Sequence, residues 1–133
     1  MKLWEKNGKK LDKEIEEFTV GNDYILDQKI VQYDAIASIA HSKMLSKEGI
    51  LTKSEAEKLE KALNEIISLA GKNKFSITVS DEDCHTAIEN FLSKKLGNLG
   101  KKIHTARSRN DQVLTALRLY SKHELLEIEK ETI

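Results

Sequence analysis

Apolar residues recur at helical spacing, mostly three, four or eight residues apart, in four separate stretches of the chain. Their positions are Leu26, Ile30, Tyr33, Ala37, Ala40 and Met44; Leu59, Leu63, Ile66 and Ala70; Ile88, Phe91, Leu92 and Leu96; and Val113, Leu117, Leu125 and Ile128. This spacing places side chains on one face of a helix. The pattern therefore predicts four main helices, with a shorter one near residues 12–18 in an otherwise irregular arm that Trp4 pins to the surface.

Start and stop signals flank these stretches. Thr52–Glu55, Ser80–Asp83 and Ser108–Asp111 each fit the capping-box pattern at the start of a helix. Gly49, Gly71 and Gly97 follow periodic stretches, where glycine commonly ends a helix. The last helix begins near Arg109, and no stop signal follows it. This pattern predicts a helix of about 24 residues within which the chain is cut.

Between the second and third helices, Phe75, Ile77 and Val79 alternate with polar residues. This stretch is too short for a sheet, so we expect an extended loop with buried anchors. The expected fold class is all-α. A small N-terminal helical domain over residues 1–106 leads into the first long helix of a helical bundle, residues 107–133.

Composition narrows the functional classes. Lys plus Arg and Asp plus Glu each number 22, so the formal net charge is zero. A neutral chain counts against a general nucleic-acid binder. The lone Cys84 fits a reducing cytoplasm. The start lacks the apolar region of a signal peptide, and no stretch is apolar for the roughly 18 residues that a membrane span needs. We expect a soluble, cytoplasmic protein.

The most polar segment, residues 104–112, leads directly into the last helix. Ser108 is the expected N-cap, so backbone N–H groups at the positive end of the helix dipole lie beside it. Arg107 and Arg109 add charge, and Ser108 and Asn110 add neutral donors. Together these groups suit a carboxylate or a phosphate. A well-capped helix after a solvated basic loop is the alternative.

A metal site is the competing interpretation of Asp81, Asp83 and His85. These residues alternate in sequence, whereas neighbours on a helix are three or four residues apart. We therefore expect three acidic residues that favour a helix N-terminus, with no metal and no cofactor.

Two longer motifs carry a family resemblance. The run from Ser80 to Glu89, Ser-Asp-Glu-Asp-Cys-His-Thr-Ala-Ile-Glu, is followed by His-Thr-Ala-Arg-Ser-Arg-Asn-Asp-Gln-Val from His104 to Val113. Together they closely resemble argininosuccinate lyases of the fumarase/aspartase superfamily. Leu3-Trp4, Tyr33-Asp34 with Ser38, and Gly49-Ile50-Leu51-Thr52 fall where that family has similar residues. The resemblance covers nearly the whole chain but about the first third of a family member.

The resemblance implies a homotetramer that cleaves argininosuccinate to arginine and fumarate. It implies substrate-binding roles for Ser38, Ser108, Arg109 and Asn110. It also implies supporting roles for His85 and Arg107, with Asp111 and Gln112 in the same run. The family's acid–base residues lie in a Thr-His segment and a Ser-rich loop beyond residue 133, so we expect the 133-residue piece alone to be inactive.

Several positions depart from the family pattern. Ala106 and Ala37 stand where glycine is usual, Ala116 stands where aspartate is usual, and Glu5-Lys6-Asn7 replaces a Gly-Gly-Arg run. If either glycine position needs a positive φ, alanine is strained there.

Two other functional classes stay open. The first is a non-catalytic structural relative, which would be consistent with alanine at residues 106 and 116. A small helical nucleic-acid module would use Lys101, Lys102, Arg107 and Arg109, and its binding would depend steeply on salt.

Overall fold

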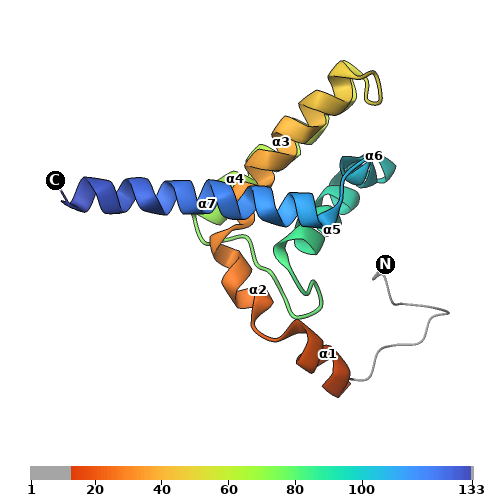
Figure 1. Ribbon diagram of the computed structural model, residues 1–133. Coiled ribbons are helices and arrows are strands. Elements are labelled where there is room, and N and C mark those ends of the chain that lie inside the picture. The colour runs from red at the N-terminus through yellow and green to blue at the C-terminus, as the bar shows by residue number, and fades with distance from the viewer. Residues whose placement is uncertain (1–12, 133) are drawn as a thin grey trace.

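The computed structural model describes residues 13–132, which form helices joined by turns and one extended loop (Figure 1). The elements are α1 (Lys13–Val20), α2 (Asp23–Leu26), the 3-10 turn η1 (Asp27–Lys29), α3 (Val31–Lys47), α4 (Lys53–Gly71), α5 (Cys84–Leu96), α6 (Asn98–Lys101), the 3-10 turn η2 (Lys102–His104) and α7 (Arg109–Thr132). No strand occurs within residues 13–132, so the all-α prediction is confirmed. Trp4 lies outside the described residues, whereas the short helix predicted near residues 12–18 is present as α1.

A helical hairpin of α3 and α4 forms the centre of the fold. Gly49 has φ +73°, and the N–H groups of Gly49 and Ile50 donate to Ser46 O and Leu45 O at 3.1 and 2.9 Å. This glycine-ended cap closes α3. Thr52 then caps α4 in a full capping box: its hydroxyl accepts from Glu55 N at 3.2 Å, and Glu55 Oε2 accepts from Thr52 N at 2.8 Å. Both predicted boundaries are confirmed.

The prediction for the first of the four main helices, with apolar positions from Leu26 to Met44, is wrong in the extent of the helix and in part of its buried face. Residues 27–29 form a 3-10 turn, so the regular helix begins at Val31. Leu26 and Met44 of the predicted stripe are 59% and 41% exposed. Helix α3 packs against both α4 and α7, so it buries a wider and rotated face. That face comprises Val31, Tyr33, Asp34, Ala35, Ala37, Ser38, Ser42 and Leu45.

Residues 72–80 form the expected extended loop. Phe75 and Ile77 are buried, and the Phe75 ring meets Phe91 edge-on at 5.9 Å, whereas Val79 is exposed. The predicted start of the next helix at Ser80 is wrong. Asp83 is the N-cap of α5, where its Oδ1 accepts from Thr86 N at 2.7 Å.

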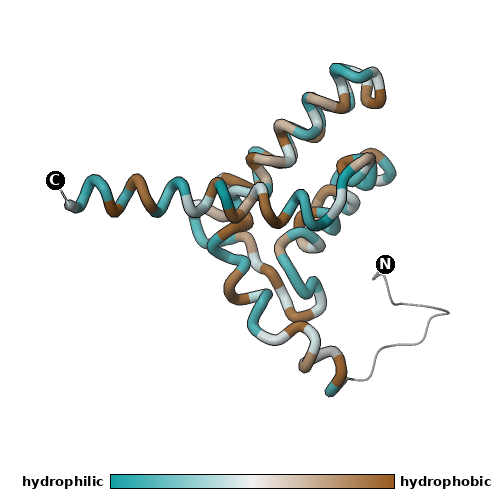
Figure 2. The backbone as a smooth tube through the Cα atoms, in the orientation of Figure 1, coloured by the Kyte–Doolittle hydropathy of each residue, from teal (hydrophilic) through white to brown (hydrophobic). Residues whose placement is uncertain are grey.

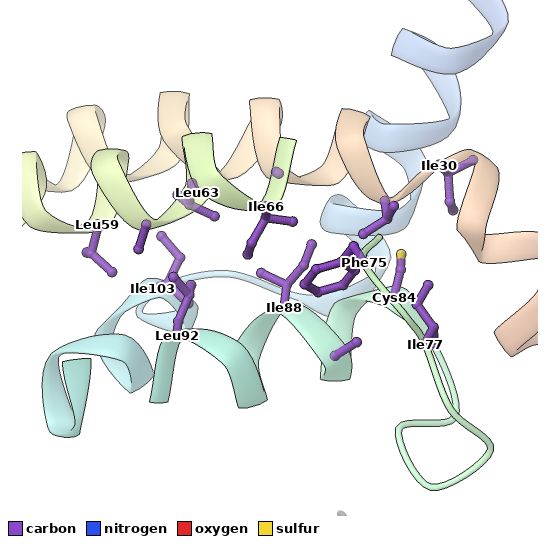
Figure 3. Close-up of a cluster of buried hydrophobic side chains, with 14 of the residues drawn as sticks. Ile30, Leu59, Leu63, Ile66, Phe75, Ile77, Cys84, Ile88, Leu92 and Ile103 are labelled. Carbon is purple, nitrogen blue, oxygen red and sulfur yellow. The ribbon is translucent and has the colours of Figure 1, made fainter. Parts of the chain in front are cut away.

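The apolar core lies between the α3–α4 hairpin and α5, with the Phe75–Ile77 loop closing one end (Figure 3). Leu59, Leu63 and Ile66 of α4 face Ile88 and Leu92 of α5, and all five are essentially inaccessible. Burying side chains of this size stabilises the fold by about 1.5–3 kcal/mol each. The core therefore fixes α5 against the hairpin and sets where its N-terminus lies.

Helix α6 follows directly on the glycine at residue 97, which ends α5 as predicted. Gly97 ends α5 with φ +61°, and a short helix and a 3-10 turn follow it. Gly100 lies so close to α5 that a Cβ there would be 2.3 Å from Leu92 C and O. Glycine at this position lets the chain fold back tightly over α5.

Gly100→Ala is expected to destabilise the fold, because the added methyl group would meet rigid backbone. Overpacking of this kind typically costs about 1–3 kcal/mol. Urea unfolding followed by circular dichroism would measure the loss. Gly71→Ala is the matched control, since a Cβ at Gly71 meets nothing within 4 Å. Equal stability of the two variants would contradict the close contact.

Helix α7 crosses the hairpin with its N-terminal half, and its C-terminal half projects from the body (Figure 1). It begins at Arg109 as predicted, and within the described residues it buries Gln112 and Ala116. Figure 2 shows apolar positions along the projecting half. The predicted apolar face is thus present but exposed. None of the helices over residues 13–132 is long and apolar enough to cross a membrane.

Candidate functional site

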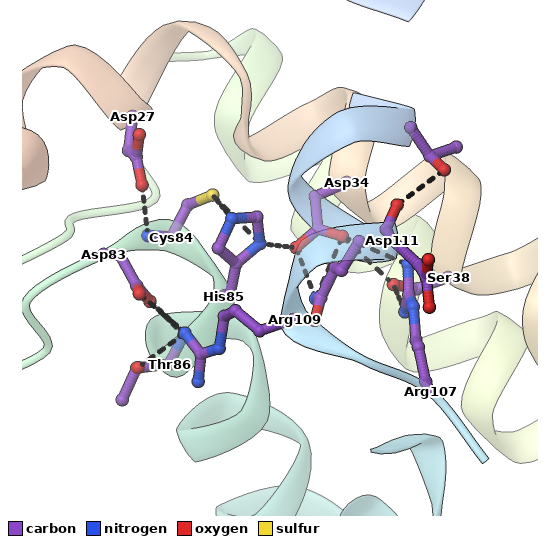
Figure 4. A network of polar contacts seen from close by, with 12 residues as sticks. Asp27, Asp34, Ser38, Asp83, Cys84, His85, Thr86, Arg107, Arg109 and Asp111 are labelled. Carbon is purple, nitrogen blue, oxygen red and sulfur yellow. Dashed lines mark hydrogen bonds and ion pairs between the residues drawn. The ribbon is translucent and has the colours of Figure 1, made fainter. Parts of the chain in front are cut away.

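A buried carboxylate, Asp34 of α3, lies at the centre of a polar network that links α3, α5 and α7 (Figure 4). It is fully inaccessible to solvent. His85 Nδ1 of α5 lies 2.7 Å from its Oδ2, and Gln112 Nε2 of α7 donates to both oxygens at 3.0 and 2.8 Å. Ser38 lies one turn further along α3 and donates to Oδ1 at 3.4 Å. A carboxylate in this environment needs such donors, because burial alone strongly disfavours its charge.

Arg107 adds a positive charge to the network. Its Nη2 lies 3.5 Å from Asp34 Oδ1, and its Nη1 donates to Ser38 Oγ at 2.8 Å. The Arg107 side chain is 7% exposed. Burial lowers the pKa of the guanidinium, and the nearby carboxylates of Asp34 and Asp111 oppose that shift. The structure therefore brings together four predicted site residues, Ser38, His85, Arg107 and Gln112, around an acid that the sequence analysis assigned no role.

Ser108, Asn110 and Asp111 are exposed on the first turn of α7, above this network. Ser108 Oγ accepts from Asn110 N at 3.2 Å, and Ser108 O accepts from Gln112 N at 3.2 Å. Ser108 thus caps α7 as predicted. The second bond of the predicted capping box, from Ser108 N to the Asp111 carboxylate, does not occur within the described residues. The donors of Ser108 and Asn110 therefore face solvent, whereas Arg107 and Gln112, on either side of this turn, face inward to Asp34.

Arg109 turns away from this surface toward α5. Its Nη1 donates to Asp83 Oδ2 at 2.6 Å and to Asp83 Oδ1 at 2.8 Å. Asp83 therefore caps α5 and neutralises Arg109 at the same time. In this arrangement the neutral donors at Ser108 and Asn110, with the helix terminus, are the groups placed to meet an anion.

Ala106 occupies the left-handed region, with φ +54°. Alanine at residue 106 is therefore strained, as expected wherever one of the two alanines that stand in place of glycine needs a positive φ. Ala37 lies inside α3, so its backbone is helical and a glycine is not required there. Ala116 is fully buried in α7. His41 Nε2 lies 3.0 Å from Thr105 O and secures the chain just before the strained residue; burial lowers the pKa of this imidazole.

Ala106→Gly is expected to stabilise the protein by about 0.5–1 kcal/mol. Left-handed geometry costs an L-residue roughly 1–2 kcal/mol, and the greater freedom of glycine in the unfolded chain offsets part of the gain. Thermal unfolding would measure it. Ala37→Gly is the matched control and should have the opposite sign, because glycine destabilises a helix interior by about 1 kcal/mol. A loss of stability in Ala106→Gly would contradict strain at this residue.

The residues of the competing metal interpretation, Asp81, Asp83 and His85, have other partners. Asp81 Oδ2 accepts from Thr78 N at 3.0 Å, Asp83 pairs with Arg109, and His85 pairs with Asp34. A different group, Asp27, Cys84 and His85, places three ligand atoms within 4.8 Å of one another. Asp27 Oδ2 already accepts from Cys84 N at 2.9 Å. Burial, reinforced by Asp27, strongly raises the pKa of the Cys84 thiol, so the thiolate that a metal needs is disfavoured.

The proposed basic surface is likewise not assembled as a set of open charges. Arg107 pairs with Asp34, Arg109 with Asp83, and Lys102 Nζ with Glu55 Oε1 at 2.6 Å. The hydrogen bonds from Lys102 and from Thr52 stabilise the charged form of Glu55 and lower its pKa to about 2. Three of the four cations are thus neutralised within the chain, which disfavours the nucleic-acid interpretation.

Comparison with known proteins shows the family to which the chain belongs. The family described as Lyase matches residues 6–132. The chain belongs to the lyase family. It is 65% identical over 127 residues to an argininosuccinate lyase of Thermotoga neapolitana, covering 96% of this chain and 32% of the relative. It is 45% identical over 130 residues to an argininosuccinate lyase of Phocaeicola vulgatus, covering 98% of this chain and 29% of that relative.

The match confirms the family resemblance carried by the two polar motifs. This lyase chain spans about a third of the length of the curated relatives it matches. The roles assigned by resemblance to Ser38, Ser108, Arg109 and Asn110 stay predictions, as does the domain division between residues 106 and 107.

Proposed function

We propose that this chain supplies substrate-binding residues to an argininosuccinate lyase. The observation that supports it most is the exposed Ser108–Asp111 turn at the start of α7, which rests on a buried charged network. Family membership and the names of the relatives support the reaction class.

In the proposed reaction, a base removes a proton from the carbon next to a substrate carboxylate. The electron pair left behind forms the C=C bond of fumarate and breaks the bond from the next carbon to its nitrogen, which takes a proton from an acid and leaves as part of arginine. Negative charge builds on the carboxylate before the C–N bond breaks. Donors held in place around that carboxylate stabilise the transition state, which carries this extra charge, more strongly than they stabilise the ground state. Ser108 and Asn110 are the proposed donors.

Ser38 and Arg109 have less direct proposed roles. Ser38 is fully buried and accepts from Arg107 Nη1. To contact substrate it would have to exchange that bond. Arg109 is held by Asp83 and would contribute through the position of the α7 terminus. The acid and base are proposed to come from outside this chain, so the piece alone is expected to release no fumarate.

A chimera tests the proposed function. This chain would replace the matching 127 residues of the Thermotoga neapolitana relative, and fumarate release would be followed by absorbance. We expect turnover within an order of magnitude of the parent enzyme and none from the isolated chain. A folded chimera without turnover would favour a non-catalytic relative instead.

The proposal includes assembly into a homo-oligomer, a tetramer in the full-length family, in the cytoplasm. Helix α7 exposes Leu114, Leu117, Leu125, Leu126 and Ile128, which are 42–66% accessible. Leu117 and Leu125 also line an open hollow of about 540 Å³ on this face. Contiguous apolar surface of this kind typically marks a contact with another protein.

Sedimentation is expected to show self-association of the chain at high micromolar concentration. Replacing Leu117 and Leu125 together by glutamate should shift the chain to monomer, because two charges would enter the apolar face. Ile50→Glu, an equally exposed position in the hairpin turn, is the control. A wild-type chain that stays monomeric would contradict the prediction.

A further inference from the structure

Both ends of the exposed Ser108–Asp111 turn are attached to one buried group. Arg107, immediately before the turn, lies 3.5 Å from Asp34 Oδ1. Gln112, immediately after it, donates to both Asp34 oxygens at 3.0 and 2.8 Å. Asp34 thus holds the chain on both sides of the four residues that carry the proposed donors (Figure 4).

We propose that Asp34 is a positioning residue, which aims the donors of Ser108 and Asn110 at the substrate carboxylate. The inference rests on the proposed function of this turn. Asp34 is 0% exposed, so it cannot contact substrate itself. It acts through the two residues that flank the turn.

The origin of its partners distinguishes Asp34 from an ordinary buried polar residue. Ser42, also fully buried on α3, bonds within its own helix, to Ile39 O at 2.8 Å. Asp34 instead takes His85 from α5, Gln112 from α7 and Arg107 from the loop before α7. Its carboxylate is therefore a shared contact for three segments, α3, α5 and the start of α7, whereas the nearby Arg109–Asp83 pair joins only α7 and α5.

Stability alone is a weak reason for such a group. A buried ion pair often contributes no more than well-packed apolar residues would, because desolvation consumes the Coulomb attraction. What the network supplies is direction, because one side chain on each side of the turn, Arg107 before it and Gln112 after it, contacts the same rigid carboxylate and fixes the orientation of the turn. Catalytic donors need that precision, because a displacement of about 1 Å can lower the rate 10²-fold.

The test compares Asp34→Asn with Leu45→Ala in the chimeric enzyme. Asparagine keeps the shape but removes the charge and one accepting oxygen. Leu45 is fully buried elsewhere on α3, so Leu45→Ala should destabilise the fold without removing any contact of the Asp34 network. We expect kcat/KM per folded site to fall about 10²-fold in Asp34→Asn and to stay near wild type in Leu45→Ala, even where its melting temperature is lower. Equal losses per folded site would overturn the proposal.

Hydrogen exchange on the 133-residue chain provides a readout that does not depend on turnover. Asp34→Asn should speed amide exchange at residues 107–112 while the amides of α4 keep their protection. Should Asp34→Asn fail to fold, Gln112→Met removes one attachment and leaves the Arg107 pair, and faster exchange is again expected at residues 107–112. Unchanged exchange there would overturn the positioning role. An inactive wild-type chimera with the expected exchange pattern would instead count against the proposed function.

Discussion

Asn110→Ala is expected to lower kcat of the chimeric lyase by about 10²–10³-fold, the usual effect of losing one preorganised donor to a developing charge. Its side chain is exposed on the first turn of α7, and its backbone N–H is already bound by Ser108 Oγ at 3.2 Å. The cap survives the substitution, so the melting temperature should change little. Asn110→Asp should be worse, because it places a carboxylate against the substrate carboxylate.

Asn64→Ala is the matched control, because Asn64 is an exposed asparagine in the middle of α4. It should leave kcat unchanged. A purely structural Asn110 would give a lower melting temperature with normal turnover in the folded enzyme. Near-normal kcat in both Asn110 variants would remove this residue from the site and weaken the interpretation of the whole turn.

Arg107→Met is expected to destabilise the isolated chain by about 3 kcal/mol or more, the usual cost of removing one partner from a buried ion pair. Asp34 would keep its bonds to His85 and Gln112 but lose the positive charge that offsets its burial. Ser38 would lose the Arg107 donor at 2.8 Å. Urea unfolding monitored by circular dichroism measures the change.

Lys43→Met removes an ion pair of the exposed kind and serves as the comparison. Lys43 Nζ lies 2.7 Å from Glu60 Oε1, with side chains that are 59% and 34% accessible. Exposed pairs contribute about 0–1 kcal/mol. If Arg107→Met cost no more than Lys43→Met, the Arg107–Asp34 pair would not be a stabilising element of the network.

Local sequence signals predicted the parts of the fold that local interactions decide. The Thr52–Glu55 capping box and the glycine at residue 49 involve partners within a few residues, and both boundaries are confirmed. The start of α7 at Arg109 is confirmed for the same reason. Ser80–Asp83 and Asp83–Thr86 compete as start signals three residues apart. Tertiary contacts decide between them, because Asp27, 57 residues earlier, accepts from Cys84 N.

The central residue of the candidate site escaped the sequence analysis for a related reason. Asp34 lies within the buried stretch of α3, one turn before Ser38, and a lone acid on an apolar helix face is a detectable signal. Three of its four partners cannot be read from the sequence, because His85, Arg107 and Gln112 reach it from other elements. Periodicity also placed Leu26 and Met44 inside, because it cannot foresee that α7 covers a second side of α3.

The spacing of the partners of Asp34 along the chain determines when its burial can be compensated during folding. The α3–α4 hairpin joins neighbouring segments and can form as soon as residues 31–71 are available. Asp34 meets His85 across 51 residues and Gln112 across 78. Closing such long loops is entropically costly, and contacts of this range form late. On a ribosome, the hairpin therefore emerges with a hydrated acid on its face, and the protein exchanges that water for His85 and Gln112 only after residue 112 has been synthesised.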